Sequence, residues 1–475
     1  SGTNTLPSLA QQQQQQKQQQ TVGLIFLPIP IILATMTTTT TTTATTTRMT
    51  TSMMNVPWSS KHKKVTNHGI GVPYNLSNSF AQPLTMDELL QLTKDRGNDN
   101  DQELLEMYYN HPLTYTPNGG SYDLRKDIAE LYYGPNTTAD DIIVFAGGQV
   151  AIQSAAFAIC GNADPTSNTH AIVCTPSYQS LQEGPKAAGV TSITYLQLSP
   201  SNGWLLNVDE VERAIDTTKK LNYIVINEPY NPAGTLMSHN TQRQLVELVQ
   251  RYNNNTSTSG AASTSTKVMI LCDEVYRLLE HDPNTTRLPA MCDACPTYGL
   301  SVVTMSKPWG ACGVTIGWIA CQNNTQLMKR DIPNIQYFGT ACPSRASELQ
   351  ARMILRANDV ILKKNMTIIR SNLVRLHEFM STNNDLFTWI PPTAGAIAFI
   401  KFKGPLSSNE LGTMLLQEAG ISIKPSYCFM DESVEGGIPP ELDYFRVGYG
   451  EQTIPAAIDK FQEFVNDHRE EWLPP

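Results

Sequence analysis

Short apolar runs recur along the middle of the chain, and helical patterns separate most of them. The runs are rich in valine and isoleucine and occupy residues 142–145, 171–174, 193–196, 223–226, 268–271 and 302–305. Continuous apolar runs that alternate with helices are typical of a mostly parallel sheet covered on both faces. The pattern therefore predicts an α/β fold, with a mostly parallel central sheet and helices on both of its faces.

The pattern changes after residue 346. Apolar residues at helical spacing cover residues 348–379, and a strand pattern follows at 395–402. A further helix is predicted from Ser408, then a strand that ends at Arg446, and a last helix from Ile454. This order predicts a smaller α+β domain in the C-terminal part of the chain.

The domain boundaries follow from these changes. Residues 1–65 form a low-complexity extension, 66–110 an N-terminal arm and first helix that contribute to the small domain, 111–340 the large domain, and 341–475 the small C-terminal domain. The first helix begins at a capping box, Thr85-Met-Asp-Glu88. Within the large domain, the polar stretch 251–267 predicts a surface insertion between a helix and the next strand.

Residues 1–65 are not expected to fold. They contain a glutamine tract and a threonine tract without a periodic apolar pattern. The apolar run 24–34 is too short, and too interrupted by proline, to span a bilayer. The segment is basic and rich in hydroxyl groups, and no Asp or Glu precedes Asp87, which is typical of organelle transit peptides. The alternative is a low-complexity extension of a cytoplasmic protein, or a translation start placed too early.

Composition narrows the classes of function. A net charge of −9 provides no basic face for nucleic acid, and the charged and apolar fractions suit a globular protein without a membrane partner. The nine cysteines are scattered, several of them inside apolar runs, and are interpreted as reduced thiols of an intracellular protein. Cys292-Asp-Ala-Cys295 could be half of a zinc site, but no second pair follows, so no metal site is expected.

Polar residues stand at the ends of several apolar runs, where burial is costly. Lys307 follows the run 302–305, Asp273 follows 268–271, and Arg446 ends a strand pattern further on. A lone lysine in such a place often extends its ammonium group to solvent. The alternative is a desolvated amine with a lowered pKa that forms a Schiff base with a carbonyl cofactor. The presence of other polar residues at the ends of apolar runs favours the second interpretation.

Taken together, these motifs resemble the fold-type-I pyridoxal-phosphate enzymes, specifically the class I/II aminotransferase family. The resemblance rests on Asn227-Glu-Pro-Tyr-Asn-Pro-Ala-Gly234, Asp273 with Tyr276, Ser306-Lys307 and Tyr444-Phe-Arg446, which occur in the order of the family. It covers the chain from residue 74 to the C-terminus. It implies pyridoxal 5'-phosphate (PLP) as cofactor, the large domain of these transferases, and a C-terminal lobe that closes over the active site.

The resemblance implies roles around the cofactor ring. Lys307 would bind PLP as a Schiff base and then act as the catalytic base. Asp273 would keep the pyridine nitrogen protonated, so that the ring withdraws electrons. Asn231 and Tyr276 would donate hydrogen bonds to the phenolate oxygen. Tyr178 would stack on the ring; the alternative is a core tyrosine.

A phosphate site is implied as well. Gly148-Gln149 lies between the run 142–145 and a predicted helix, where N–H groups and the positive end of the helix dipole suit a phosphate. Thr304 and Ser306 are placed to hydrogen-bond it. Tyr115 matches a tyrosine that reaches the phosphate of the neighbouring subunit. The resemblance therefore implies a homodimer with shared active sites.

The implied reaction is amino transfer from an L-amino acid to a 2-oxo acid. Arg446, with Asn231, would bind the substrate α-carboxylate, because a planar guanidinium suits a bidentate contact; the alternative is a surface arginine on an edge strand. The same site could serve a PLP-dependent lyase, cyclase or oxidase. A non-catalytic PLP-fold binding protein is a further alternative, against which the retained motif residues argue.

Two departures from the family pattern concern the phosphate and the substrate. Thr315 stands where the family usually has a basic residue that neutralises the phosphate. The segment Ser77-Asn-Ser79 lacks the usual glycine-rich entry strand, so an unusual pocket for the substrate side chain is expected.

Overall fold

The computed structural model describes residues 72–161, 168–254, 266–340, 342–430 and 438–473. The predicted extension 1–65 and the core of the predicted insertion, 255–265, lie outside these residues. Within them, no helix is long and apolar enough to cross a membrane.

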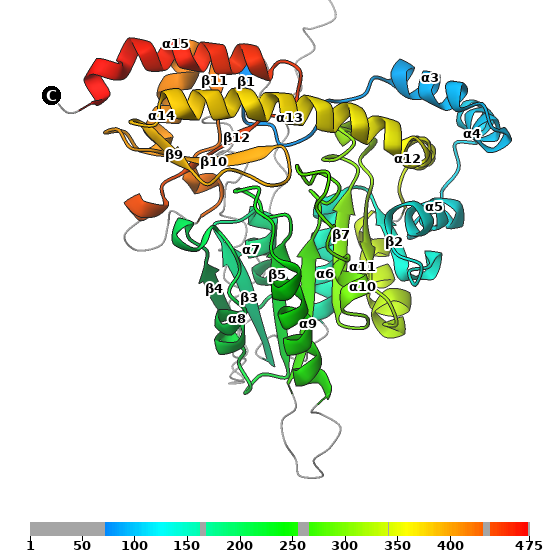
Figure 1. Cartoon of the computed structure of the whole chain (residues 1–475). Coiled ribbons are helices and arrows are strands. Elements are labelled where there is room, and N and C mark those ends of the chain that lie inside the picture. Colours follow the sequence, from blue (N-terminus) through cyan, green and yellow to red (C-terminus); the bar gives the residue numbers. More distant parts are fainter. Residues whose placement is uncertain (1–71, 162–167, 255–265, 341, 431–437, 474–475) are drawn as a thin grey trace, which may run out of the picture. The chain divides into compact units, whose positions relative to one another are not determined.

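A mostly parallel sheet lies at the centre of the large domain, which confirms the predicted fold class (Figure 1). Its strands in the described residues follow the order β2-β8-β7-β6-β5-β3-β4. Neighbouring strands are parallel except at β8, which pairs antiparallel with both β2 and β7. The bounds are β2 Ile142–Phe145, β3 Thr169–Thr175, β4 Ser192–Gln197, β5 Leu221–Asn227, β6 Lys267–Asp273, β7 Gly299–Thr304 and β8 Gly317–Ala320.

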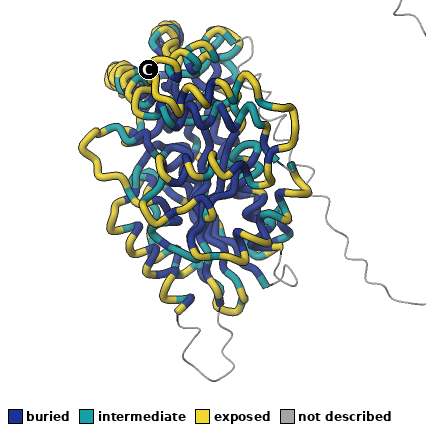
Figure 2. Tube along the Cα trace, turned by 90° about the vertical axis from the view of Figure 1, so that its right-hand side faces the viewer, coloured by how far each residue is buried: buried dark blue, intermediate teal, exposed yellow. Residues whose placement is uncertain are grey.

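Alternate residues of β5 show that both faces of the sheet are covered. Tyr223 and Val225 belong to the buried cluster that includes the apolar face of α6, whereas Ile224 and Ile226 pack in the cluster that contains α9. Figure 2 shows the buried residues, in dark blue, along the interior of the described part. The helices of this domain are α5 Tyr122–Tyr132, α6 Gly148–Cys160, α7 Gln179–Ala187, α8 Val208–Ala214, α9 His239–Asn254, α10 Met291–Ala294 and α11 Ile332–Gly339.

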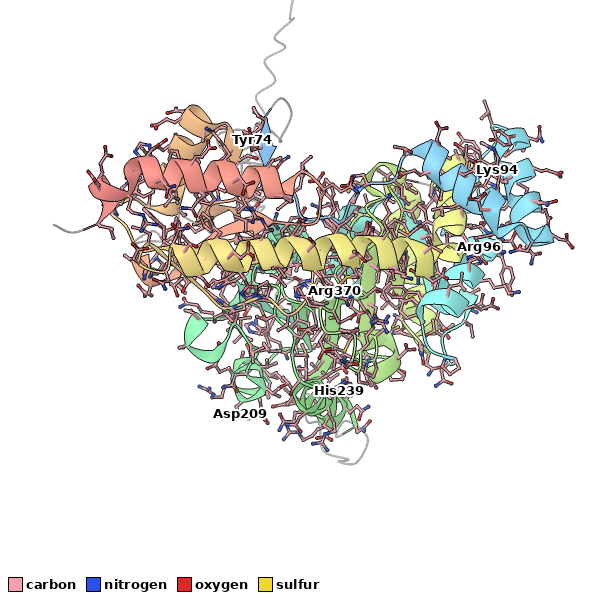
Figure 3. All side chains as sticks on the ribbon, turned by 45° about the horizontal axis from the view of Figure 1, so that its top comes forward. Tyr74, Lys94, Arg96, Asp209, His239 and Arg370 are labelled. Atoms are coloured by element: carbon pink, nitrogen blue, oxygen red, sulfur yellow. The ribbon has the colours of Figure 1, made fainter. Side chains whose placement is uncertain are left out.

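The smaller C-terminal part is an antiparallel sheet with helices. β10 (Ile397–Phe402) lies between β9 (Phe387–Trp389) and β12 (Phe445–Gly448). Its helices are α13 Asn358–Thr382, α14 Ser408–Met414 and α15 Ile454–Trp472. Arg370 of α13, labelled in Figure 3, donates from Nε to the carbonyl oxygen of His281 at 2.8 Å, which ties this helix to the loop after β6.

The helical stretch predicted over residues 348–379 is helical, with one interruption. It is two helices, α12 (Arg345–Arg356) and α13, with a break at Ala357, whose ψ of 14° is not helical. Leu349 of α12 packs in the cluster with the large-domain strands β2, β7 and β8, whereas Ile369 of α13 packs in the small-domain core. The break therefore allows two consecutive helices to join two different cores.

The N-terminal arm is shared between the two cores. β1 (Tyr74–Asn75) pairs in parallel with β11 (Ile421–Ser422) of the small domain. The next two helices, α3 (Met86–Arg96) and α4 (Asp99–Asn110), instead place their apolar side chains in the cluster with α5 and α12. The predicted capping box is present, since the Thr85 side chain accepts from the Glu88 N–H group and the Glu88 side chain from the Thr85 N–H group.

Two glycines bring the arm close to the ends of the strands. The N–H group of Gly448 donates to the Leu76 carbonyl oxygen at 2.7 Å, and a Cβ atom at Gly448 would overlap with the Asn78 carbonyl group. Gly310, at a φ of 63°, lies similarly close to the carbonyl oxygen of Gln82. Residues 76–82 are thereby held next to both β12 and the loop that follows β7.

Candidate active site

The side chains predicted to carry the chemistry converge at the carboxyl ends of the central strands. Asp273 ends β6, Lys307 follows β7, and Asn231 follows β5. Arg446 comes from β12 of the small domain, and its guanidinium group reaches Asn231. Ligand sites of open parallel sheets lie at this edge, so the fold itself favours this location.

Lys307 is half-buried and contacts the N-terminal arm. Its Nζ donates to Ser79 Oγ at 3.0 Å, and its carbonyl oxygen accepts from the Ala81 N–H group at 3.0 Å. The arm therefore orients the lysine from outside the large domain. The sequence connects the segment Ser77-Asn-Ser79 with the substrate pocket but does not predict the contact between Ser79 and Lys307, because no local pattern indicates it.

Asp273 is buried and one of its oxygen atoms is unsatisfied. The side chain is 3% exposed, and Oδ1 has no hydrogen-bond partner in the described residues. Burial raises the pKa of Asp273 to about 7, against the opposing effects of the Val275 N–H group and the Lys307 charge. A carboxyl group in such a place is stabilised in its ionised form by a cationic partner.

The neighbouring Glu274 faces the other way, as strand alternation predicts. Its Oε1 accepts hydrogen bonds from the Met291 N–H group at 2.6 Å and from Ser301 Oγ at 3.0 Å. The side chains of Asp273, the last residue of β6, and Glu274, the residue that follows it, thus point to opposite sides of the sheet.

Arg446 is buried and held by neutral acceptors. Its Nη1 donates to Asn231 Oδ1 at 3.0 Å and its Nη2 to the Ser77 carbonyl oxygen at 2.9 Å. Its Nε has no partner in the described residues, although the residue is only 2% exposed. The alternative of a surface arginine on an edge strand is therefore wrong. A guanidinium group without an ionic partner is suited to bind an anion.

Asn231 is oriented by this contact and by its own backbone. Its N–H group donates to Asn227 Oδ1 at 2.6 Å. Because its side-chain oxygen accepts from Arg446, the NH₂ group of Asn231 remains as the donor toward a ligand.

The predicted phosphate residues also lie together. A Cβ atom at Gly148 would lie 3.3 Å from the Thr304 Cβ atom, so the N-terminus of α6 adjoins the end of β7. Thr304 and Ser306 share a hydrogen bond of 3.1 Å between their hydroxyl groups. Gln149 Nε2 donates to the Tyr178 hydroxyl group at 2.5 Å. Among the described residues, no arginine or lysine donates a hydrogen bond to any of these side chains.

Two tyrosines adjoin this cluster. Burial raises the pKa of Tyr178 to about 12, and the negative charge of Asp273 acts in the same direction. Tyr276 is 1% exposed and packs against the backbone at Gly395.

Two further residues of the prediction are exposed, and Thr315 is next to Ile316, whose carbonyl oxygen accepts from Thr304 Oγ1 at 3.2 Å. Tyr115 is 91% exposed and, in the described residues, makes no contact with the phosphate residues of its own chain. Thr315 is exposed and adopts a left-handed conformation, with φ of 51°, after the short helical turn Cys312–Val314.

Comparisons with known proteins agree with this geometry. Residues 110–434, more than half of the chain, match the family "Aminotransferase class I and II". An aspartate aminotransferase of Sulfolobus acidocaldarius is 22% identical over 74% of this chain and 82% of its own length. A capreomycidine synthase of Streptomyces vinaceus is 24% identical over 58% of this chain, and the match spans 63% of the length of that synthase.

Solved structures show the same fold. A PLP-dependent aminotransferase from Streptococcus suis superimposes with a TM-score of 0.70 at 22% identity, over 86% of this chain and 97% of the other. The PLP-dependent cyclase OrfR gives a TM-score of 0.67 at 20% identity, over 83% and 93% of the two chains. The chain is therefore an enzyme of the class I and II aminotransferase family, whose cofactor is pyridoxal 5'-phosphate.

Proposed function

We propose that this chain is an aminotransferase that moves the amino group of an L-amino acid to a 2-oxo acid, with Lys307 as the residue that binds PLP. The observation that carries the proposal is the convergence of Lys307, Asp273 and Arg446 at one edge of the central sheet. The reaction requires three groups of the protein: an amine that binds the cofactor, a buried carboxyl group that faces its ring, and a guanidinium group that binds the substrate carboxylate.

The residues fit the cofactor. Asp273 Oδ1 is buried without a partner in the described residues, as expected of a carboxylate that faces a protonated ring nitrogen. The NH₂ group of Asn231 is available as a donor, and the N-terminus of α6 offers N–H groups to a phosphate. The residues proposed to hold PLP are Gly148, Gln149, Tyr178, Asn231, Asp273, Tyr276, Thr304, Ser306 and Lys307, with Tyr115 of the partner subunit.

When bound, PLP supplies an aldehyde for the substrate amine and a ring that withdraws electrons from the substrate Cα atom. The protein supplies the proton transfer. The Nζ atom of Lys307 removes the proton from Cα, and the hydrogen bond to Ser79 Oγ keeps the amine directed along the arm. With PLP bound, the Asp273 carboxylate would keep the ring nitrogen protonated.

Arg446 is proposed to bind the substrate α-carboxylate. Asn231 and the Ser77 carbonyl group fix its guanidinium plane, so the group is oriented before the substrate arrives. Because its protein partners are neutral, the full positive charge is available to the carboxylate.

A second candidate reaction is cyclisation or elimination at the same site. Cyclisation is supported by the similarity to the PLP-dependent cyclase OrfR, whose TM-score of 0.67 is close to the 0.70 of the aminotransferase from Streptococcus suis. The protein groups described above serve both reactions, because each begins with the removal of a proton from Cα.

The decisive experiment is a panel of L-amino acids with the purified, PLP-loaded protein and a 2-oxo acid acceptor. Mass spectrometry would quantify the new amino acid and the new 2-oxo acid, and a coupled assay would quantify ammonia. Equal formation of both transfer products without ammonia supports amino transfer. Ammonia or a cyclic product without conversion of the acceptor would replace the proposal by the second candidate.

We further propose that the chain forms a homodimer. Exposed apolar side chains gather on the loop after α4 and at the end of α11, where Leu113 is 97% exposed and Phe338 is 87% exposed. Thr116 Oγ1 donates to the Pro343 carbonyl oxygen at 2.5 Å, so this loop lies beside the segment after α11. A second copy of the chain would cover this surface and receive Tyr115 at its phosphate site.

A further inference from the structure

A cavity of 240 Å³ lies beside the start of α9, on one face of the central sheet. The buried residues that line it include Glu228, Cys272 and Glu274, and Cys272 belongs to the buried cluster that contains α9. The exposed residues of the lining include Thr286 and His239, the first residue of α9, which is labelled in Figure 3. The cavity therefore opens to solvent on the side of the sheet to which Glu274 points, away from the candidate active site.

Two buried carboxyl groups of this cavity have an oxygen atom without a partner. Glu228 is 8% exposed; its Oε1 accepts from the Met237 N–H group at 3.0 Å, and its Oε2 has no hydrogen-bond partner in the described residues. Glu274 is 3% exposed, and its Oε2 is buried without a partner among the same residues. Burial raises the pKa of Glu228 to about 8 and that of Glu274 to about 7, because the ionised forms are poorly stabilised there. A ligand that donates hydrogen bonds to both carboxyl groups would remove this cost.

The other charged side chains of the lining already have partners. Arg287 Nη2 forms an ion pair with Glu280 Oε2 at 2.8 Å. The guanidinium group of Arg277 lies over the Tyr132 ring, with Cζ 4.9 Å from the ring centroid, and its Nη1 donates to the Tyr132 carbonyl oxygen at 3.2 Å. The lining thus has three carboxyl groups against two guanidinium groups, an excess of one negative charge when all of them are ionised.

The rest of the lining indicates what kind of cation would fit. Among the described residues, no group of three His, Cys, Asp or Glu side chains could hold a metal ion. The walls of the cavity are apolar and consist of Pro229, Leu236, Met237, Leu288, Pro289 and Met291. Carboxyl groups between apolar walls match an ammonium group on a compact apolar body.

We propose that this cavity is a second ligand site, which binds a small organic amine in its protonated form. The ammonium group donates to the carboxyl groups of Glu228 and Glu274, and the carbon body packs against Met237 and Leu288. The site is separate from the proposed reaction, because Glu274 and Asp273 point to opposite sides of the sheet. It nevertheless adjoins the backbone of the active site, since the Glu228 N–H group donates to the Asp273 carbonyl oxygen at 3.0 Å.

The test is a titration of the PLP-loaded protein with N,N-dimethylbutylamine and with butan-1-ol, followed by ligand-observed NMR, which detects weak binding. The tertiary amine is cationic at neutral pH and cannot condense with the PLP aldehyde, so the cofactor does not contribute to the signal. The wild type is expected to bind the amine at least about tenfold more tightly than the alcohol, because only the amine pairs with the carboxyl groups. Equal affinities for the two compounds, or no binding of the amine, would overturn the inference.

Variants assign the binding to this cavity. Glu228→Gln and Glu274→Gln keep an acceptor oxygen for the backbone N–H groups, and each is expected to weaken binding of the amine by about 10- to 100-fold. Leu288→Trp, which fills the cavity and changes no charge, should abolish binding and decides the case if a glutamine variant does not fold. The matched control is Glu348→Gln, whose buried carboxyl group already pairs with Arg345 at 3.0 Å, and this variant should bind the amine like the wild type. An affinity that none of the cavity variants lowers, or that the control lowers equally, would contradict the inference.

Discussion

At the scale of single residues, the site is defined by charges that the fold buries without compensating them. Asp273 and Arg446 are each almost inaccessible, and each retains a polar atom without a partner in the described residues. Such burial costs stability unless a ligand completes the interaction. We therefore expect a cationic group to bind at Asp273 and an anionic group at Arg446 when the enzyme is loaded.

Asp273→Asn is predicted to retain PLP but to lose at least about a hundredfold in kcat, because an amide cannot hold the proton on the ring nitrogen. The measurement is steady-state turnover, with the PLP content quantified after gel filtration. Glu274→Gln is the matched control, since this neighbouring carboxyl group serves the opposite side of β6. Full activity of Asp273→Asn would show that the carboxylate is only structural.

The pH dependence of stability tests the burial of the same carboxyl group. Its pKa rises from 3.8 to about 7 in the folded chain, so the folded state holds this proton more tightly than the unfolded state. Its contribution, on the order of a few kcal/mol, is fully present below the unfolded pKa and lost as the pH rises through the folded pKa.

The melting temperature of the cofactor-free protein is therefore predicted to fall as the pH rises from about 4 to about 7, the interval between the unfolded and the folded pKa of Asp273. Asp273→Asn, which cannot ionise, should make this fall shallower. The buried Glu274 acts in the same direction, with its pKa raised to about 7, so part of the slope remains in the variant. Identical slopes for the wild type and the variant would show that Asp273 is not protonated in the folded, cofactor-free chain.

At the scale of elements, much of the site could be predicted because it follows strong strands. Asp273, Asn231 and Lys307 come at or just after continuous apolar runs, and parallel strands bring such positions together at one edge. The positions of these three residues at the edge of the sheet can therefore be predicted from the neighbouring sequence alone. The contact between Arg446 and Asn231 is not, because it depends on how the small domain meets the large one.

Other features of the fold and the site could not be predicted, because no pattern in the neighbouring sequence indicates them. Strand β8 begins at Gly317 in a glycine-containing segment that suggests a loop, and its role depends on pairing with β2 and β7. Neither glycine nor proline marks the break at Ala357. Ser79 reaches Lys307 from the N-terminal arm, whose strand β1 pairs with β11, a short segment far away in sequence.

A prediction at the scale of elements concerns the phosphate site, near which Thr315 stands in place of a basic residue. Thr315→Arg is predicted to slow the loss of PLP during dialysis by about 10- to 100-fold, since a charge-assisted hydrogen bond contributes roughly 1.5–3 kcal/mol. The left-handed backbone at this position is more strained for a β-branched residue than for arginine, so the replacement should not destabilise the fold. Thr315→Gln, which has length but no charge, is the control. Equal retention by all three proteins would show that the phosphate needs no further cation.

At the scale of the whole molecule, the proposed homodimer would account for the exposed position of Tyr115. The wild type is predicted to sediment as a dimer. Phe338→Glu should produce monomers that lose PLP more readily, because a charge at the interface opposes association and removes Tyr115 from the partner's phosphate site. Val374→Glu, at a residue of α13 that is 58% exposed, is the control that should remain dimeric. A fully active monomer would contradict the shared site.

The central claim, that this fold binds PLP at Lys307, has one direct measurement. The purified protein would be loaded with PLP, reduced with borohydride, digested and mapped by mass spectrometry. The account predicts a single pyridoxyl group, attached to Nζ of Lys307, and no labelling of that peptide in Lys307→Ala. A pyridoxyl group on another lysine such as Lys424, or a wild type without any label after loading, would contradict it.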